Sequence, residues 1–404
     1  MTNGRFANIL ITAALMAGCA FLLFNPLRLA FIANVFVPFL ISSLLIMLCC
    51  GLWFCAQWRR VEIKRIEYLL VLFVVVTAAF TPYEGRKAVD IGIDLLRPIL
   101  FVVTVIMIRN FVNVEMLNYS KLVRWWLRAS MWVTLVIVPV CWLISVHFQP
   151  LYPAFSSIDS VLGLGWLLAV GNGFGSGLYL SVLIASGKRG VYLAAFLVLC
   201  VCFLNRRLLT RRGWGSFVLG LAVGGFIFSL LLGEIQQLFF KGVDVGSGVE
   251  VAEAGAKLTE VASGLGGGRV EELRGALSAL TSYSQLIFGA GLGFAYPAQG
   301  FGPAGELHRN LHFTPASLAF YYGVPFTLAF FYYLSTFFFA ALRITNRSPG
   351  VVSYCYAVYC LSSMLFLLTE FSVFSYANFA ISCGVVGATT RMQDSDIKAG
   401  SQVQ

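Results

Sequence analysis

Long apolar stretches separated by short polar links run through most of the chain. Many of them approach or exceed the roughly 20 residues that an α-helix needs to cross a bilayer. The pattern therefore predicts an all-α, polytopic membrane protein with about twelve transmembrane helices. The predicted spans are Phe6–Phe24, Phe31–Ala56, Tyr68–Pro82, Leu95–Val112, Ala129–Val146, Ile158–Val170, Phe174–Ser186, Val191–Leu204, Ser216–Leu232, Phe313–Leu342, Val351–Thr369 and Phe371–Thr389.

The composition agrees with a membrane protein and excludes an ordinary soluble one. Of the 404 residues 59% are hydrophobic and only 11% are charged, whereas soluble proteins carry about 25% charged residues. The net charge of +10 could suggest a nucleic-acid partner. The basic residues gather in short loops between apolar stretches instead, so the expected partner is the lipid bilayer, with no nucleic acid.

The basic loops predict the orientation of the spans, because short loops rich in Lys and Arg stay in the cytoplasm. With the N-terminus inside, the strongly basic loops 59–65, 121–128 and 206–212 all fall in the cytoplasm. The link GNG at 171–173 is very short, but a single crossing there would move 206–212 outside. We therefore predict two crossings at this point and a bacterial inner-membrane protein with both termini inside.

This orientation divides the chain into four parts. They are the first nine transmembrane helices at 1–232, a large periplasmic loop with the catalytic residues at 233–311, transmembrane helices ten to twelve at 312–392, and a cytoplasmic tail at 393–404.

The long loop is too large for a simple connection, and its pattern predicts short amphipathic helices. Residues 249–262 have helical spacing. Further on, an apolar stripe at helical spacing predicts that Arg269 opens a short helix lying against the membrane surface. The stripe consists of Val270, Leu273, Leu277 and Leu280. The glycines at 266–268 would leave the first amide groups of this helix open to an anion.

Cations near the predicted outer face are candidate contacts for an anionic substrate. The motif SGKRG places Lys188 and Arg189 at the outer end of an apolar helix pair, where they are either interface anchors or substrate ligands. The loop adds Arg269, Arg274 and Arg309. An arginine fork matches phosphate oxygens in two-point contacts, although a lone loop arginine is usually only solvated.

The segment ELHRNLHFTP holds two histidines just before the tenth predicted span. His312 lies next to the expected helix N-terminus, where it is either an interfacial polar anchor or a general base working near pH 7. His308 lies four residues earlier and could pair with His312. The two histidines have no carboxylate or cysteine partners at ligand spacing, so no metal site is predicted.

The glycine-rich stretch GAGLGF at 289–294 has the glycines of a nucleotide-binding loop but not its setting. A nucleotide loop follows a strand and opens a helix, and this stretch has neither neighbour. We interpret it as a tight turn that returns the chain to the membrane.

Three pieces occur in order: SGKRG, then a loop with GGGR and LIFGAGLGF, then HFTPASLAFYYGVP. This order resembles the O-antigen ligase and O-antigen polymerase superfamily of bacterial envelopes over about 186–325. That family has a Ser-x-Arg-Gly-like motif, a loop arginine with a Gly-x-Gly-x-Gly turn, and a histidine followed eleven residues later by glycine. Gly323 lies eleven residues after His312, which selects His312 over His308. Phe313, where the family often has Asn, and the inserted Lys188 are departures.

The resemblance implies a metal-independent, inverting glycosyltransferase without cofactors. Its donor would be an undecaprenyl diphosphate-linked oligosaccharide, and its acceptor a hydroxyl of a lipid-linked repeat or of lipid A-core. Arg189 and Arg269 would neutralise the diphosphate leaving group, and His312 would take the acceptor proton. Lys188, Arg274, His308, Arg309 and Asn310 would bind substrate, and a chain-length regulator is a candidate partner.

Two functions share this chemistry, and a third differs. A repeat-unit polymerase for O-antigen or a related polysaccharide leads, and an O-antigen ligase of lipopolysaccharide biosynthesis follows closely, because one sequence does not reveal the acceptor surface. A flippase or transporter would instead have charged residues at mid-membrane depth. The predicted spans are nearly free of buried charge, which favours an interfacial enzyme.

Overall fold

The computed structural model describes residues 3–31, 36–148, 158–185, 191, 194–196, 198–200, 211–230, 269–280, 282–297, 307–309, 311, 313–347, 350–367, 374 and 376–401. At several segment ends, including residues 269–272 and 307–308, only the backbone is described. Within these ranges the regular secondary structure is helical apart from one two-stranded β ladder, and turns and irregular segments connect the elements.

The elements, in chain order, are α1 (Asn3–Phe31), α2 (Phe36–Gln57), η1 (Trp58–Arg60), α3 (Arg65–Phe80), α4 (Ala88–Phe111), α5 (Val114–Tyr119), α6 (Lys121–Phe148), η2 (Ile158–Ser160), α7 (Val161–Ala169), α8 (Gly173–Ala185), α10 (Arg211–Leu230), α13 (Arg269–Ser278), α14 (Tyr283–Phe288), β1 (Tyr296–Pro297), β2 (Leu307–His308), α15 (Thr314–Arg347), α16 (Val351–Phe366) and α17 (Ala377–Ser401).

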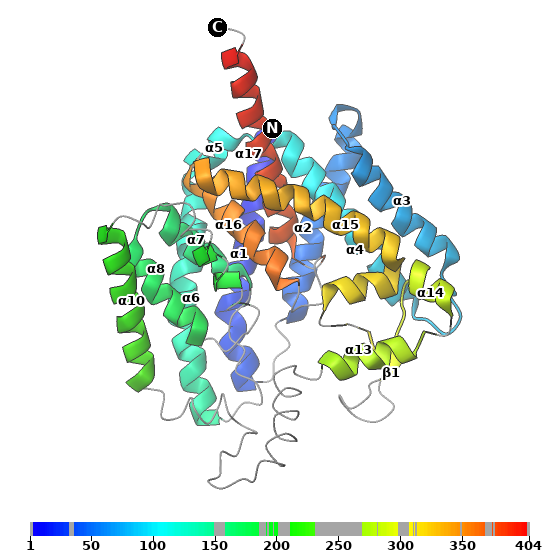
Figure 1. The fold of residues 1–404 in the computed structure, drawn as a ribbon, viewed down its shortest axis with the longest axis horizontal. Helices are drawn as coiled ribbons and strands as arrows, with labels where there is room; N and C mark the ends of the chain where they lie inside the picture. Colours follow the sequence, from blue (N-terminus) through cyan, green and yellow to red (C-terminus); the bar gives the residue numbers. More distant parts are fainter. Residues whose placement is uncertain are drawn as a thin grey trace.

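The helices form a bundle with two distinct ends (Figure 1). α8 packs along α10, α1 along α6, and α4 along α17. The start of α1 and the end of α17 lie at the same end of the bundle, whereas α13 and β1 lie at the other. The two termini are therefore on one side and the segments of the long loop on the opposite side.

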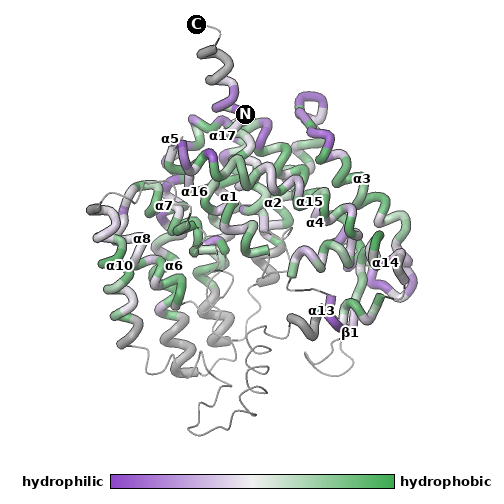
Figure 2. The backbone as a smooth tube through the Cα atoms, in the orientation of Figure 1, coloured by the Kyte–Doolittle hydropathy of each residue, from purple (hydrophilic) through white to green (hydrophobic). Residues whose placement is uncertain are grey.

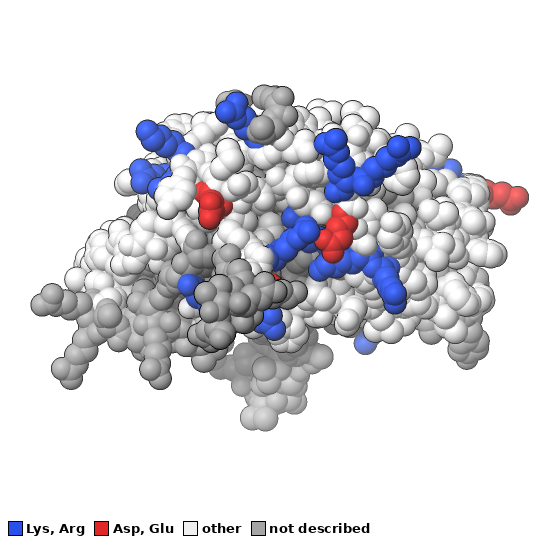
Figure 3. Space-filling view, turned by 90° about the horizontal axis from the view of Figure 1, so that it is seen from above, with Lys and Arg blue, Asp and Glu red and all other residues white. Residues whose placement is uncertain are grey.

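The membrane character of the chain is confirmed. Within the described residues α1, α2, α4, α6 and α15 are each long and apolar enough to cross a membrane. Hydrophobic positions dominate the helices, and hydrophilic positions gather at the end with the termini and around α13 and α14 (Figure 2). On the face at the terminal end, Lys and Arg are more widespread than Asp and Glu (Figure 3).

Several helices extend beyond the predicted spans. α4 begins at Ala88 rather than near residue 95, so its first turns carry acidic residues that were assigned to a loop. α1 continues as helix to Phe31, although its candidate membrane span ends at Phe24, as predicted. α17 continues as helix through residues 393–401 of the predicted tail. Polar residues obscured each boundary, because hydropathy reports where a helix meets lipid and not where it ends.

The two short predicted spans around residue 171 are two helices. A turn in which Gly171 has φ +72° separates α7 from α8. α7 has nine residues, which corresponds to about 14 Å of helix against a hydrocarbon core of roughly 30 Å. The separation into two helices is confirmed, but α7 alone is too short to cross a bilayer.

Buried charge within the bundle corrects the expectation that the spans are nearly free of it. Glu67 of α3 is fully buried and forms an ion pair with Arg109 of α4, which is only 5% exposed. Tyr333 of α15 donates a hydrogen bond to Glu67 Oε1 at 2.9 Å. Arg109 Nη2 also donates to Glu62 O at 2.8 Å. The buried Glu67 carboxylate therefore joins α3, α4 and α15, and Arg109 and Tyr333 supply its hydrogen bonds.

We predict that Glu67→Gln destabilises the protein strongly. Removing one charge of a buried pair leaves the other uncompensated, at a cost of about 3–5 kcal/mol. Thermal unfolding in detergent measures the loss. The matched control is Arg391→Gln, which breaks the exposed Arg391–Glu62 pair and should change the midpoint little. Equal midpoints for the two variants would contradict a structural role for the Glu67–Arg109 pair.

A second buried carboxylate lies where α1, η2, α16 and α17 meet. Asp159 is 1% exposed. Its Oδ1 accepts hydrogen bonds from the Tyr359 hydroxyl at 2.6 Å and from Asn378 Nδ2 at 3.2 Å. Asn378 Nδ2 also donates to the carbonyl of Ala14 at 3.2 Å. The carboxylate thus links four elements that are distant in sequence.

Candidate functional site

α13 begins at Arg269, as the apolar stripe predicted. The face of α13 that is buried differs in part from the predicted stripe. Ala276 is fully buried, and Leu273 and Leu280 pack beside it, whereas Leu277 is 45% exposed. Ala276 was overlooked because a small side chain adds little to a hydrophobic stripe, although it permits close packing.

The buried face of α13 packs against the segment that leads into α15. Ala276 shares one small apolar cluster with Tyr296, Leu311 and Phe320. Tyr296 of β1 also pairs with His308 of β2 in the antiparallel ladder. The helix that starts at Arg269 and the chain on either side of residue 312 are therefore parts of one packed unit, although more than thirty residues separate them.

The glycine-rich stretch is the tight turn that the sequence predicted. Gly289, Gly291 and Gly293 have φ of +83°, +90° and +70°, values that residues with a Cβ atom rarely adopt. The amide of Ala290 donates to the carbonyl of Phe320 at 2.6 Å. These glycines let the chain reverse while lying directly against α15.

Residues from the α3–α4 connection hold this turn in place. Arg86 donates to the carbonyl of Ala290 at 2.8 Å and to the carbonyl of Leu292. The amide of Leu292 donates to Thr81 Oγ1 at 3.0 Å. Partial burial lowers the pKa of Arg86 from its ordinary value, but an arginine remains charged at neutral pH. The turn is thus fixed to a segment that lies about two hundred residues earlier.

Asp94 of α4 is the centre of the polar contacts. Its Oδ2 accepts hydrogen bonds from the Gly293 amide and from Arg309 Nη2, both at 2.7 Å. Its carbonyl accepts from the Tyr322 hydroxyl at 2.6 Å. One helical residue therefore connects the glycine turn, the histidine segment and α15.

Arg309 lies between two carboxylates. It forms ion pairs with Asp90 and with Asp94, and its side chain is 24% exposed. The Tyr321 hydroxyl donates to the Arg309 carbonyl. The pairing fixes the chain near residue 312 against α4, and the contact of Arg309 with substrate stays a prediction.

We predict that Arg309 and Asp94 are energetically coupled. Asp94→Asn and Arg309→Gln should each lower the unfolding midpoint, and the double variant should lose clearly less than the sum. Residues in one ion-pair network show coupling energies of about 0.5–3 kcal/mol. Thermal unfolding of the four proteins measures the coupling. Strict additivity would show that the two side chains do not stabilise each other.

A break in α15 receives the glycine turn. Gly323 has φ +86° and ψ +167° inside this helix. A Cβ atom there would lie 2.5 Å from the carbonyl oxygen of Ile287, and one on Gly289 would lie 2.7 Å from the Gly323 amide nitrogen. Pro325 two residues later has no amide hydrogen to donate. The two glycines thus permit backbone-to-backbone contact between the loop and α15.

The remaining predicted site residues are placed only in part. Arg274 is an exposed residue of α13. Arg269 opens that helix and His308 lies in β2, with only the backbone described for each. His312, Asn310, Lys188 and Arg189 lie outside the described residues. Leu311 is buried, and the amide of Thr314 donates to the Leu367 carbonyl at 3.1 Å, so the chain is fixed on both sides of residue 312.

Sequence reasoning missed the residues that hold the unit together. Asp90, Asp94 and Arg86 were assigned to a connecting loop. The spacing of Asp90 and Asp94, four residues apart next to a long apolar run, places both on one face of a helix. Carboxylates at the edge of a membrane helix require partners, and that signal could have identified them.

Comparison of the sequence with protein-family models and with characterised proteins finds no match.

Proposed function

We propose that the chain is a membrane glycosyltransferase of the bacterial inner membrane, with about twelve transmembrane helices and a periplasmic loop. It moves a glycan from undecaprenyl diphosphate to a hydroxyl acceptor, as a repeat-unit polymerase. The main support is the packed unit of α13, the glycine turn and the chain around residue 312. In this unit α13, which begins at Arg269, packs in one apolar cluster with Leu311, and α13 lies at the end of the bundle opposite the termini.

The reaction needs a base, a cationic surface and a fixed geometry. His312 takes the proton of the acceptor hydroxyl as that oxygen attacks the anomeric carbon. The bond to the diphosphate breaks on the opposite face, which inverts the anomeric centre. Arg269 and Arg189 stabilise the charge that develops on the leaving diphosphate. The contacts of Asp94 and Arg309 keep the histidine segment in position.

The ligase uses the same donor and differs only in its acceptor, lipid A-core. A transporter is the second candidate, because Asp159 is a carboxylate buried within the bundle. Buried ionisable groups mark proton and ion pathways in many transporters. The hydrogen bonds from Tyr359 and Asn378 satisfy one oxygen of Asp159, which also agrees with a purely structural link between helices.

The proposal is tested with purified protein in proteoliposomes and undecaprenyl diphosphate-linked glycan. We expect elongation of a second lipid-linked repeat, at the same rate in EDTA as in magnesium, since arginines neutralise the diphosphate. Transfer to lipid A-core alone would assign the ligase. A strict magnesium requirement would contradict the role of the arginines.

A further inference from the structure

Arg97 of α4 lies one turn after Asp94, within the apolar stretch Ala88–Phe111. Its side chain is partly buried. The carboxylates of Asp90 and Asp94 pair with Arg309. Within the described part of the chain, Arg97 has no hydrogen bond or ion pair, although it lies close enough to Asp94 and Tyr322 to interact electrostatically.

The cluster of charged groups that interact with Asp94 or Arg309 has an excess of positive charge. Its described members are three guanidinium groups, those of Arg86, Arg97 and Arg309, and the two carboxylates of Asp90 and Asp94. Placing an arginine in a membrane helix costs about 2.5–3.5 kcal/mol on insertion scales, and such residues mark functional sites by default. An unpaired guanidinium beside a site for lipid-linked substrates is suited to bind a phosphate.

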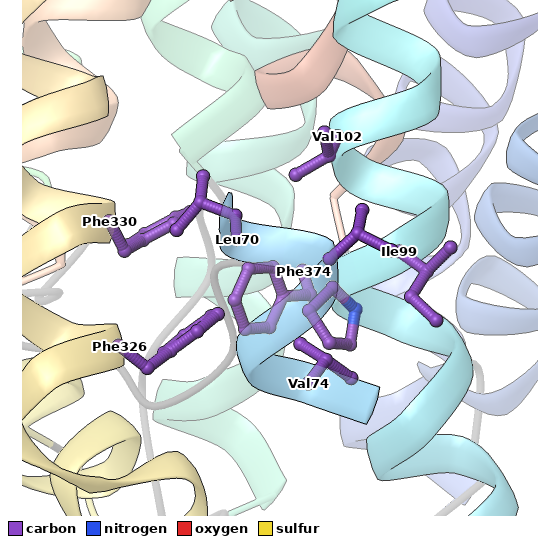
Figure 4. A pocket seen from close by; sticks show the side chains of 9 residues that line it. Leu70, Val74, Ile99, Val102, Phe326, Phe330 and Phe374 are labelled. Carbon is purple, nitrogen blue, oxygen red and sulfur yellow. The ribbon is translucent and has the colours of Figure 1, made fainter. Parts of the chain in front are cut away.

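The residues that follow Arg97 on α4 line an apolar crevice (Figure 4). Pro98 and Ile99 of α4 line it together with Leu70 and Val74 of α3 and the aromatic rings of Phe326 and Phe374. The Tyr322 ring, whose hydroxyl donates to the Asp94 carbonyl, packs against Phe326 at 4.6 Å and Phe374 at 6.4 Å between centroids. The side chains nearly fill the crevice, so an occupant must part the two phenylalanine rings.

We propose that Arg97 and this crevice bind the polyprenyl diphosphate lipid, with a phosphate at the guanidinium and the start of the hydrocarbon chain between α3 and α15. A cation at one end and apolar walls beyond it are complementary to an anionic long-chain lipid. The identity of the lipid rests on the proposed function. Its head would lie beside the Arg309 segment and the glycine turn, which Asp94 holds one helical turn away.

Binding of labelled undecaprenyl diphosphate to the purified full chain in phosphatidylcholine nanodiscs tests this site. Arg97→Gln should weaken binding about 10- to 100-fold, the range for a lost charged hydrogen bond, and Arg97→Lys should weaken it less. Val74→Trp, which fills the crevice, should also weaken it. The matched controls are Arg59→Gln in η1 and Leu72→Trp in α3, where the Leu72 side chain is 56% exposed. Both variants should bind the lipid normally.

Competition separates the sources of phosphate. Inorganic diphosphate should compete weakly with the labelled lipid. Its competition should be lost in Arg97→Gln but retained in Val74→Trp. Phosphatidylglycerol should compete poorly, and equal competition would overturn the assignment to the polyprenyl lipid. Normal binding by Arg97→Gln would overturn the site itself. Loss of stability in Arg97→Gln would show that the cation has a structural role, because removal of an unpaired buried charge should leave the midpoint unchanged or higher.

The assay needs no acceptor, so its outcome is independent of transfer. Wild-type binding that depends on Arg97 without any glycan transfer would leave the site intact and refute the proposed function. Normal glycan transfer and normal lipid binding by Arg97→Gln would refute the Arg97 site and leave the proposed function intact.

Discussion

His312→Ala and Arg269→Ala should each abolish glycan transfer while the protein remains folded and present at the wild-type level. A positioned general base contributes about 10²–10⁴-fold, and removing an electrostatic donor costs roughly 10²–10³-fold. Either loss would leave no visible polysaccharide ladder in cells. Turnover by purified variants with undecaprenyl diphosphate-linked glycan measures the residual rate.

His308→Ala is the matched control for the histidine, because it changes the same residue type four positions away. His308 pairs with Tyr296 through the backbone ladder, so its side chain can be removed without breaking that contact, and we expect a mild effect. Near-normal turnover by His312→Ala with an inactive His308→Ala would assign the base to His308. Near-normal turnover by both and by the double variant would refute a histidine base.

Gly323→Ala should lower both stability and activity. The backbone conformation at Gly323, with φ +86° and ψ +167°, costs a residue with a Cβ atom about 1–3 kcal/mol. The added carbon would also collide with the Ile287 carbonyl at 2.5 Å and with the backbone of Phe288 at 2.7 Å. The loop must then move away from α15, which also disturbs the contacts of Asp94 with Gly293 and Arg309.

Alanine substitutions at two other glycines distinguish backbone strain from the collision with the loop as causes of this loss. Gly85 has φ +74° but open space around its Cβ position, so Gly85→Ala reports conformational strain alone. Gly225 lies in α10 with nothing near its Cβ position, so Gly225→Ala should be neutral or slightly stabilising. Thermal unfolding and transfer rates are compared for the three variants. If Gly323→Ala matches Gly225→Ala in both, the contact between loop and helix is unimportant.

Local patterns predicted the elements of the candidate site better than their contacts. The stripe after Arg269 and the glycines at 289–293 report local backbone conformation, so the helix and the turn could be predicted. The interval from His312 to Gly323 is part of the resemblance, and the close approach of Gly323 and Gly289 gives a physical reason for glycine at that position.

The long-range contacts could not be predicted from one sequence. Asp94 and Arg309 are 215 positions apart, and hydropathy placed Asp94 in a loop because an acidic residue lowers the score of its window. Glu67 and Arg109 were missed for a similar reason: each lies near the end of an apolar run, where a charge usually faces water. Only the packing of α3, α4 and α15 shows that these two charges are buried together.

The central claim is that the chain breaks the bond between a glycan and its polyprenyl diphosphate carrier. The most direct measurement is the amount of undecaprenyl diphosphate released per glycosidic bond formed by the purified protein, with the anomeric configuration of the product determined by NMR. We predict one diphosphate lipid per new bond and an inverted anomeric centre. Donor lipid that crosses the bilayer with its glycan still attached, and without any new bond, would contradict the claim.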